Sequence, residues 1–383
     1  MIGITSLYCG RTHSGDALRY RHRRRSAPRR PIVVWNATRR CNLRCRHCYA
    51  ASDEDRSVDE LSTARAKSMI DDLADFGVPV LLFSGGEPLL RADLLELIAH
   101  AKRAGLRAVI SSNGTLIDAA MATRLAEAGL AYAGISLDGL KDVNDAFRGQ
   151  AGAFERTLEG IRHCRAAGVK TGLRLTITRR NVDEIPGVFD LIEAERIPRV
   201  CFYHLVPAGR AGDLDDAQLS HARTREVMNL IMDRSADLAK TDPSVEVLTV
   251  ANHADGPYVA LRLQREDPAR AAEAMKLLRA NGGNASGEGI ACIRWDGTVL
   301  PDQFWPDQPL GNVTDRPFSE IWSDETGLLG ELRNRREHLH CRCVDCRFLD
   351  VCNGNMRARA AGAGDLWGED PACYLTDEEI APE

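Results

Sequence analysis

The chain has 383 residues, of which 44% are apolar, enough for the cores of one large domain and a smaller one. A formal net charge of −5 is too small to indicate a nucleic acid or a membrane surface as a partner. The sequence contains no run of about 18 apolar residues and no signal-peptide pattern, so we expect a cytoplasmic protein without a membrane span.

The first element along the chain is basic. Residues 21–30 read RHRRRSAPRR and contain six arginines. We expect residues 1–30 to form a basic, solvated N-terminal arm. An arm that attracts an acidic substrate or partner protein is the alternative.

Residues 31–210 alternate between short apolar runs and helical patterns. A capping-box pattern at Ser57–Glu60 predicts the start of the first helix, and glycines end four of the helices. The alternation predicts an α/β fold with a parallel sheet, and six strands are too few for a closed eight-stranded barrel. We therefore predict a partial (β/α)6, TIM-like barrel whose active site lies at the C-terminal strand ends. The predicted strands are 32–37, 79–83, 106–111, 131–136, 170–177 and 199–205.

The pattern changes after residue 210. Residues 211–286 are predicted to be a helical connector with a strand at 245–250, and residues 287–383 a small irregular domain. Asp296-Gly297 predicts a hairpin in that domain. Few apolar runs and five cysteines indicate that a metal cluster orders this last region.

The cysteines are numerous and clustered. Of twelve, three lie within residues 41–48 and five within 341–373. Such clustering in a large chain favours metal binding over disulfides. Cys9, Cys164 and Cys201 are interpreted as free thiols.

The first cysteine motif is Cys41-x3-Cys45-x2-Cys48. Three thiolates in one tight loop suit a 4Fe-4S cluster and leave its fourth iron open for another ligand. A structural zinc site with His47 as fourth ligand is the alternative.

The second motif, Gly85-Gly86-Glu87-Pro88, ends the second predicted strand. Glycines there let a ligand approach the backbone closely. Glu87 can accept hydrogen bonds from an ammonium group.

The third motif is Cys343-x2-Cys346-x5-Cys352-x20-Cys373. Four thiolates can fill all four sites of a second 4Fe-4S cluster. A zinc ribbon is the alternative.

CNLRCRHCY followed by SGGEP resembles the radical S-adenosylmethionine (SAM) superfamily. The resemblance implies that the open iron binds SAM and that one electron cleaves SAM to methionine and a 5′-deoxyadenosyl radical. It implies a catalytic role for the three cluster cysteines at 41, 45 and 48. It implies SAM contacts from Gly85, Gly86, Glu87, Asn113, Ser136 and Arg174.

The C-terminal cysteines resemble the SPASM extension of this superfamily, which in its full form holds two auxiliary clusters. Gly287-x4-Cys292 is similar to the start of the first auxiliary site, but Met356 stands where a further cysteine is expected. We therefore predict one auxiliary cluster, held by the third motif. Cys292 and Cys341 are predicted to be spare thiols, with a role as alternate ligands left open.

Longer segments, among them HLVPAGRAG, NHADGPY and NGGNASGEGIACIRWDG, resemble the NirJ family of heme d1 biosynthesis. The resemblance implies removal of propionates from 12,18-didecarboxysiroheme and a reductase, ferredoxin or flavodoxin as electron donor. Val206-Pro207 departs from the polar pair expected of the family. The arginines considered for the substrate carboxylates are Arg210, Arg294 and Arg357, whereas structural roles are favoured for His204 and His253.

Three other functions stay open. One is a radical SAM enzyme of the alternative heme pathway, and another is a SPASM-type enzyme that modifies a peptide. The peptide function is disfavoured because only about 30 arginine-rich residues precede the first strand. The third is a non-catalytic protein that binds zinc through its cysteines.

Overall fold

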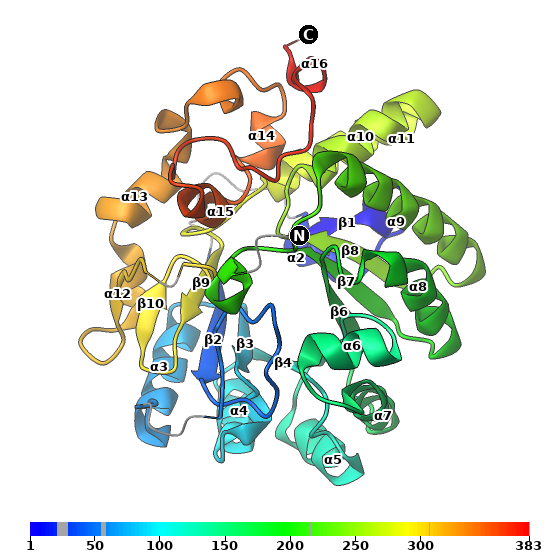
Figure 1. The fold of residues 1–383 in the computed structure, drawn as a ribbon. Helices are drawn as coiled ribbons and strands as arrows, with labels where there is room; N and C mark the ends of the chain where they lie inside the picture. The colour runs from blue at the N-terminus through cyan, green and yellow to red at the C-terminus, as the bar shows by residue number, and fades with distance from the viewer. Residues whose placement is uncertain (21–29, 55–58, 214–216, 306, 383) are drawn as a thin grey trace.

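A curled sheet forms the centre of the computed structural model, which describes residues 1–20, 30–54, 59–213, 217–305 and 307–382. The sheet has eleven strands in the order β1-β8-β7-β6-β5-β4-β3-β2-β9-β10-β11 within the described residues. Helices cover its outer face, and the sheet is an unclosed barrel (Figure 1). The predicted fold class is confirmed.

Parallel strands make up the middle of the sheet, each paired to the next along the chain. All six strands predicted between residues 31 and 210 are present, and β8 adds a seventh beyond the predicted core. The strands are β2 (Ile32–Thr38), β3 (Val80–Gly85), β4 (Arg107–Ser112), β5 (Tyr132–Ser136), β6 (Thr171–Ile177), β7 (Arg199–His204) and β8 (Glu246–Val250).

Four of the helices between these strands end close to the predicted glycines. The helices are α3 (Thr63–Asp75), α4 (Leu94–Arg103), α5 (Ala119–Ala128), α6 (Lys141–Arg148), α7 (Ala153–Ala166) and α8 (Ile185–Ala194). The start predicted for the first helix is wrong, because Ser62 caps α3 by accepting a hydrogen bond from the Arg65 backbone N–H. Ser57 lies outside the described residues.

The first residues of the chain belong to the fold, which corrects the predicted arm. Strand β1 (Ile2–Gly3) pairs antiparallel with β8, and α1 (Ile4–Leu7) is buried throughout. Helix α2 (Asp16–Arg19) brings Arg19 to 2.8 Å from Glu246 on β8. Apolar burial and this ion pair anchor the segment. Residues 21–29, which hold most of the arginines, lie outside the described part of the chain.

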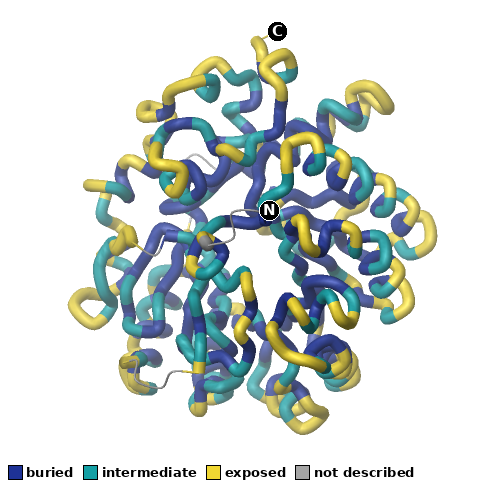
Figure 2. The backbone as a smooth tube through the Cα atoms, viewed as in Figure 1, coloured by how far each residue is buried: buried dark blue, intermediate teal, exposed yellow. Residues whose placement is uncertain are grey.

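Strand alternation separates two environments in the barrel. Trp35 and Phe83 are 0% exposed and pack toward the helices, and Figure 2 shows the sheet as the most buried layer. Asn36 and Ser84, the next residues on the same strands, face the interior, where both contact the Tyr49 hydroxyl. The barrel interior is therefore polar near the C-terminal strand ends.

The rest of the chain packs along the two edges of the sheet. The predicted hairpin is present as β9 (Ile290–Ile293) and β10 (Thr298–Leu300), with β9 parallel to β2 and β11 (Gly311–Asn312) beside β10. The helices are α9 (His221–Thr241), α10 (Asp255–Glu266), α11 (Pro268–Asn281), α12 (Phe318–Ser323), α13 (Gly327–Arg333), α14 (Leu349–Cys352), α15 (Arg357–Gly362) and α16 (Asp377–Ile380).

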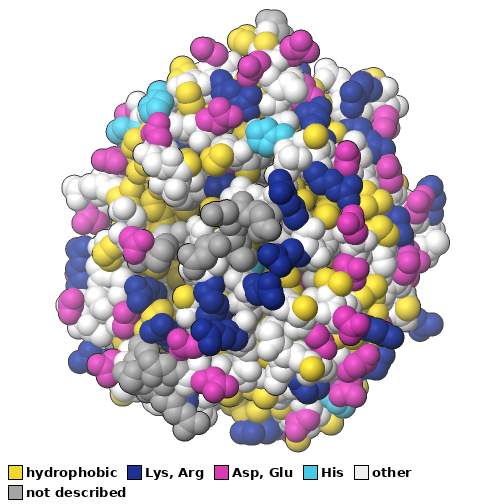
Figure 3. All heavy atoms as spheres, viewed as in Figure 1, with side chains coloured by type: hydrophobic (Ala, Val, Ile, Leu, Met, Phe, Trp, Pro, Cys, Tyr) yellow, Lys and Arg dark blue, Asp and Glu magenta, His cyan; other side chains and the backbone are white. Residues whose placement is uncertain are grey.

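Basic and acidic side chains alternate over much of the face drawn in Figure 3, in keeping with the small net charge. Among the described residues, no helix has the length and apolar character needed to cross a membrane.

Candidate active site

Three thiols meet in the loop that follows β2. Cys41 and Cys45 are each 8% exposed and pack with Leu43, and Cys48 lies against the same group. The loop lies at the C-terminal end of the parallel strands, the edge where barrels of this kind place their chemistry. The structure therefore brings together the three cysteines of the first motif.

The surroundings of these thiols suit an iron–sulfur cluster held by thiolates. Burial raises the pKa of Cys41 to about 12, and burial also raises the pKa of Cys45. The Leu43 backbone N–H donates to Cys41 Sγ at 3.4 Å, and Arg148 donates to Cys45 Sγ at 3.6 Å. Neighbouring buried thiolates repel one another unless metal charge compensates them, and iron supplies that charge in a 4Fe-4S cluster. The donor set fits the predicted cluster.

His47 does not complete a zinc site. Its Nε2 lies 3.3 Å from Asp138 Oδ2, and its ring packs 4.6 Å from the Phe147 ring. Burial lowers the pKa of His47 to about 4. Within the described ranges, no three His, Cys, Asp or Glu side chains are arranged to share one metal ion. In a cubane each thiolate binds a different iron, so three thiols of one loop can share a cluster without sharing one metal ion.

Gly85 and Gly86 bring β3 against the cysteine loop. The Gly86 N–H donates to the Thr38 carbonyl at 2.8 Å, and the Glu87 N–H donates to the Arg40 carbonyl at 2.8 Å. A Cβ atom would lie 2.3 Å from Thr38 O at Gly85 and 2.1 Å from Arg40 O at Gly86. The glycines thus allow a close approach of two backbone segments, and their contact with SAM stays a prediction.

The Glu87 carboxylate has an internal role that the sequence did not predict. It is 0% exposed and accepts hydrogen bonds from Ser112 Oγ at 2.9 Å, Asn113 N at 2.8 Å and Leu89 N at 3.2 Å. Burial raises the pKa of Glu87 to about 7, although these donors oppose the rise. The carboxylate joins the ends of β3 and β4, and its contact with the SAM ammonium group stays a prediction.

Asn113 supports the cysteine loop from β4. Its Nδ2 donates to Asn42 Oδ1 at 2.9 Å, and Asn42 Nδ2 donates to Thr115 Oγ1 at 2.9 Å. Asn42 directly follows Cys41. The Asn113 side chain therefore orients the loop, whether or not it also contacts SAM.

Ser136 and Arg174 lie side by side on β5 and β6. Arg174 donates to Ser111 Oγ at 2.7 Å and lies close to Tyr49 and Tyr203 inside the barrel. Within the described residues it forms no ion pair with a carboxylate. A guanidinium without an acidic partner is suited to bind the SAM carboxylate, and this contact of Arg174 stays a prediction.

Arg210 holds the cysteine loop. Its Nε donates to the Cys45 carbonyl at 2.9 Å and its Nη1 to the Ser52 carbonyl at 2.7 Å. Arg148 likewise forms a buried ion pair with Asp138 at 2.5 Å beside Cys45. The carboxylate-binding role of Arg210 stays a prediction. Sequence reasoning missed Arg148, because no local signal links the loop to a residue about a hundred positions away.

The four thiols of the third motif also come together. Burial strongly raises the pKa of Cys352, and the neighbouring thiols of Cys373, Cys343 and Cys346 raise it further. Burial raises the pKa of Cys343 to about 12, with Cys341 also beside it. Four mutually close thiols fit the second 4Fe-4S cluster.

The site of the missing cysteine is apolar. Met356 is 4% exposed and packs with Val206 and Ala251, which explains the departure at Val206. Cys292 is 0% exposed and lies apart, between Val34 and Leu300. This arrangement agrees with a single auxiliary cluster.

Most of the other polar residues considered as substrate contacts already interact with protein groups. Arg357 is 0% exposed and donates to the Gly368 carbonyl at 2.7 Å, so its predicted contact with substrate is wrong. Arg294 stacks on Trp295 at 4.5 Å, lies 3.7 Å from Asp296 Oδ2 and keeps 30% of its side chain exposed. His204 Nε2 lies 2.9 Å from Asp255 Oδ2, consistent with the favoured structural role.

Comparison with known proteins agrees with these two sites. The radical SAM superfamily model matches residues 35–192, and the SPASM iron–sulfur cluster-binding domain matches residues 286–347. Fe-coproporphyrin III synthase of Methanosarcina barkeri is 52% identical over 99% of both chains. Pre-heme d1 synthase of Dinoroseobacter shibae is 43% identical over 91% of this chain and 87% of its own. An AdoMet-dependent heme synthase of Nitratidesulfovibrio vulgaris is 35% identical over 93% of this chain and 95% of its own.

Among solved structures, Streptococcus suis SuiB bound to S-adenosylmethionine has a TM-score of 0.70 at 17% identity, covering 91% of this chain and 78% of SuiB. This likeness confirms the fold. The cofactors are thus SAM and 4Fe-4S clusters, which together supply a 5′-deoxyadenosyl radical. The chain belongs to the radical SAM superfamily and carries a C-terminal SPASM domain.

Proposed function

We propose that this enzyme modifies the side chains of a siroheme-derived iron tetrapyrrole. The similarity to Fe-coproporphyrin III synthase, which is 52% identical along 99% of the chain, carries the proposal. The three-thiol loop and polar barrel interior support the radical chemistry such a reaction needs. In this proposal Cys41, Cys45 and Cys48 hold the SAM-binding cluster, and Arg174 and Ser136 face SAM.

We favour Fe-coproporphyrin III as the product. The sequence motifs indicated heme d1 biosynthesis, but identity to the pre-heme d1 synthase is lower, at 43%. Removal of two propionates from 12,18-didecarboxysiroheme is therefore the second candidate, supported by that similarity and by the shared segments. A peptide substrate has weaker support, because the likeness to SuiB is at 17% identity and extends to the fold alone.

Arg294 is the arginine we propose as a contact to a substrate carboxylate. Of the three arginines considered, Arg210 and Arg357 donate to backbone carbonyls, whereas the Arg294 side chain stays 30% exposed. An arginine at this position can bind a carboxylate through two parallel hydrogen bonds.

Mass spectrometry of the tetrapyrrole tests the proposal. The reconstituted, reduced enzyme is incubated without oxygen with SAM and 12,18-didecarboxysiroheme, with Cys45→Ala as the control. A product identical to authentic Fe-coproporphyrin III supports the first candidate, and loss of two propionates supports the second. Formation of 5′-deoxyadenosine with an unchanged tetrapyrrole would refute the substrate class while leaving the family intact.

A further inference from the structure

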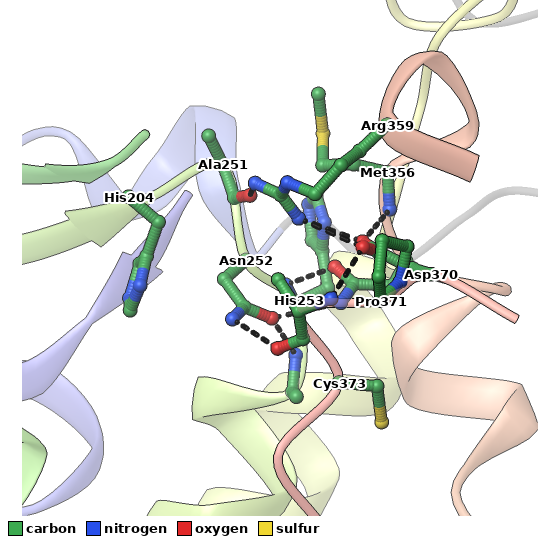
Figure 4. A network of polar contacts seen from close by, with 12 residues as sticks. His204, Ala251, Asn252, His253, Met356, Arg359, Asp370, Pro371 and Cys373 are labelled. Atoms are coloured by element: carbon green, nitrogen blue, oxygen red, sulfur yellow. Dashed lines mark hydrogen bonds and ion pairs between the residues drawn. The ribbon is translucent and has the colours of Figure 1, made fainter. Parts of the chain in front are cut away.

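One buried guanidinium connects the C-terminal region to the rim of the barrel. The Arg359 side chain, on α15, is 0% exposed. Its Nη2 donates to the carbonyls of Leu205 at 3.2 Å and Ala251 at 2.7 Å. These two residues directly follow β7 and β8, so the contact is made at the C-terminal strand ends (Figure 4).

The other side of the same guanidinium holds the segment that carries Cys373. Arg359 Nη1 donates to both carboxylate oxygens of Asp370, at 3.1 and 2.8 Å. Asp370 also accepts hydrogen bonds from Met356 N at 3.0 Å and Ala372 N at 2.9 Å, and its carbonyl accepts from Cys373 N at 2.9 Å. Asp370 thereby fixes the backbone next to a cysteine of the auxiliary site.

The turn after β8 completes the joint between the two regions. Asn252 Nδ2 donates to the Ala372 carbonyl at 2.9 Å, and Asn355 Nδ2 donates to Asn252 Oδ1 at 2.8 Å. The His253 N–H donates to Asn355 Oδ1 at 2.6 Å. Removing one partner of a buried hydrogen bond costs more stability than removing one partner of an exposed pair, because the group left behind has no water to bond. The buried polar groups of this joint therefore depend on one another.

We propose that Arg359 is a positioning residue that fixes Cys373, and with it the auxiliary cluster, against the barrel rim at β7 and β8. A purely local ion pair would need only Asp370, whereas this guanidinium also bonds two carbonyls of the barrel. The proposal rests on the proposed auxiliary ligands and is independent of the substrate. It predicts that loss of Arg359 changes the placement of the two clusters relative to each other.

Arg359→Met tests this role, with Arg357→Met as the matched control. Arg357 lies on the same helix and is equally buried, but it donates only to Gly354, Leu366 and Gly368 within the C-terminal region. We expect Arg359→Met to keep its iron and to weaken the magnetic interaction between the two reduced clusters in electron paramagnetic resonance (EPR) spectra. The hydrogen-exchange rate of the backbone amides at 251–253 should rise about tenfold, because the substitution removes buried hydrogen bonds made by a charged group. The control should leave exchange at 251–253 unchanged.

Unchanged magnetic interaction and unchanged exchange at 251–253 in Arg359→Met would overturn the proposal. If Arg359→Met loses its auxiliary iron, Arg359→Lys is measured in its place. Lysine keeps the positive charge beside Asp370 but lacks the planar guanidinium that bonds several acceptors at once. Retained iron with a weakened interaction in the lysine variant supports positioning. Iron loss in both variants rejects it. Cys373→Ala tests the ligand set separately: if it retains the auxiliary cluster, the ligand assignment fails.

Discussion

Gly86→Ala is the substitution that most directly tests how the cysteine loop is held. The new Cβ would lie 2.1 Å from the Arg40 carbonyl oxygen, whereas ordinary contact begins at 3.4 Å, so the two segments must separate by about 1.3 Å (3.4 − 2.1). Every near atom belongs to the backbone of Arg39 or Arg40, so no flexible side chain can absorb the shift. Cys41 is the next residue along this backbone.

We expect the variant to cleave SAM about 100-fold more slowly, because a displacement of about 1 Å at a reactive centre has an effect of that size. Overpacking should also destabilise the fold by about 1–3 kcal/mol. The assay is the rate of 5′-deoxyadenosine formation by chromatography after anaerobic reconstitution, with iron per chain measured on the same sample.

Gly212→Ala is the matched control, since an added Cβ there meets no atom of the described residues within 4 Å. It should assemble both clusters and cleave SAM at the wild-type rate. The auxiliary cluster serves as an internal check that Gly86→Ala is folded. If Gly86→Ala cleaved SAM as fast as the wild type, the inference that Gly86 is required for the close backbone contact would be refuted.

Three further predictions concern other parts of the molecule. Arg210→Met removes two hydrogen bonds from the cysteine loop, so a chelator should extract iron from that cluster severalfold faster; equal extraction rates would contradict this. Burial holds the pKa of His253 well below its ordinary value of 6.5, so the unfolded chain binds an extra proton in acid and stability falls as the pH drops below 6.5. His253→Gln should reduce the loss between pH 7.5 and 5.5 by about 1.4 kcal/mol in denaturant titrations, and an identical pH dependence would argue against it. Cys292→Ala should retain both clusters in iron analysis whereas Cys352→Ala loses the auxiliary one, and the reverse result would reassign the ligands.

Local patterns account for the parts of the fold that the sequence predicted. The six strands were found because each is a short apolar run between a helix and a turn, with helix stops such as Gly77, Gly105 and Gly129 marking the repeats. Residues 2–7 were missed because a two-residue strand and a single helical turn have almost no periodicity. Ile2, Ile4 and Leu7, all at most 1% exposed, were their only signal.

The residues of the candidate site also fall into those that local sequence patterns indicate and those that they do not. Cysteine ligands to one cluster lie within a few residues of each other, so spacing alone indicates Cys41, Cys45 and Cys48. The residues that hold the loop come from distant elements, and nothing in the sequence links Arg210 to the carbonyl of Cys45. The sequence selects the glycines at 85 and 86, but it does not show their close contact with the backbone of the cysteine loop, which comes from another strand.

The account depends on a cluster at 41–48 whose open iron binds SAM, and EPR of the reduced protein measures this directly. Replacing Cys343, Cys346 and Cys352 together by alanine leaves only that cluster to observe. The account predicts a 4Fe-4S signal that changes shape when SAM is added. A cluster signal that is insensitive to SAM, or the absence of a cluster in this variant while the wild type retains one, would contradict it.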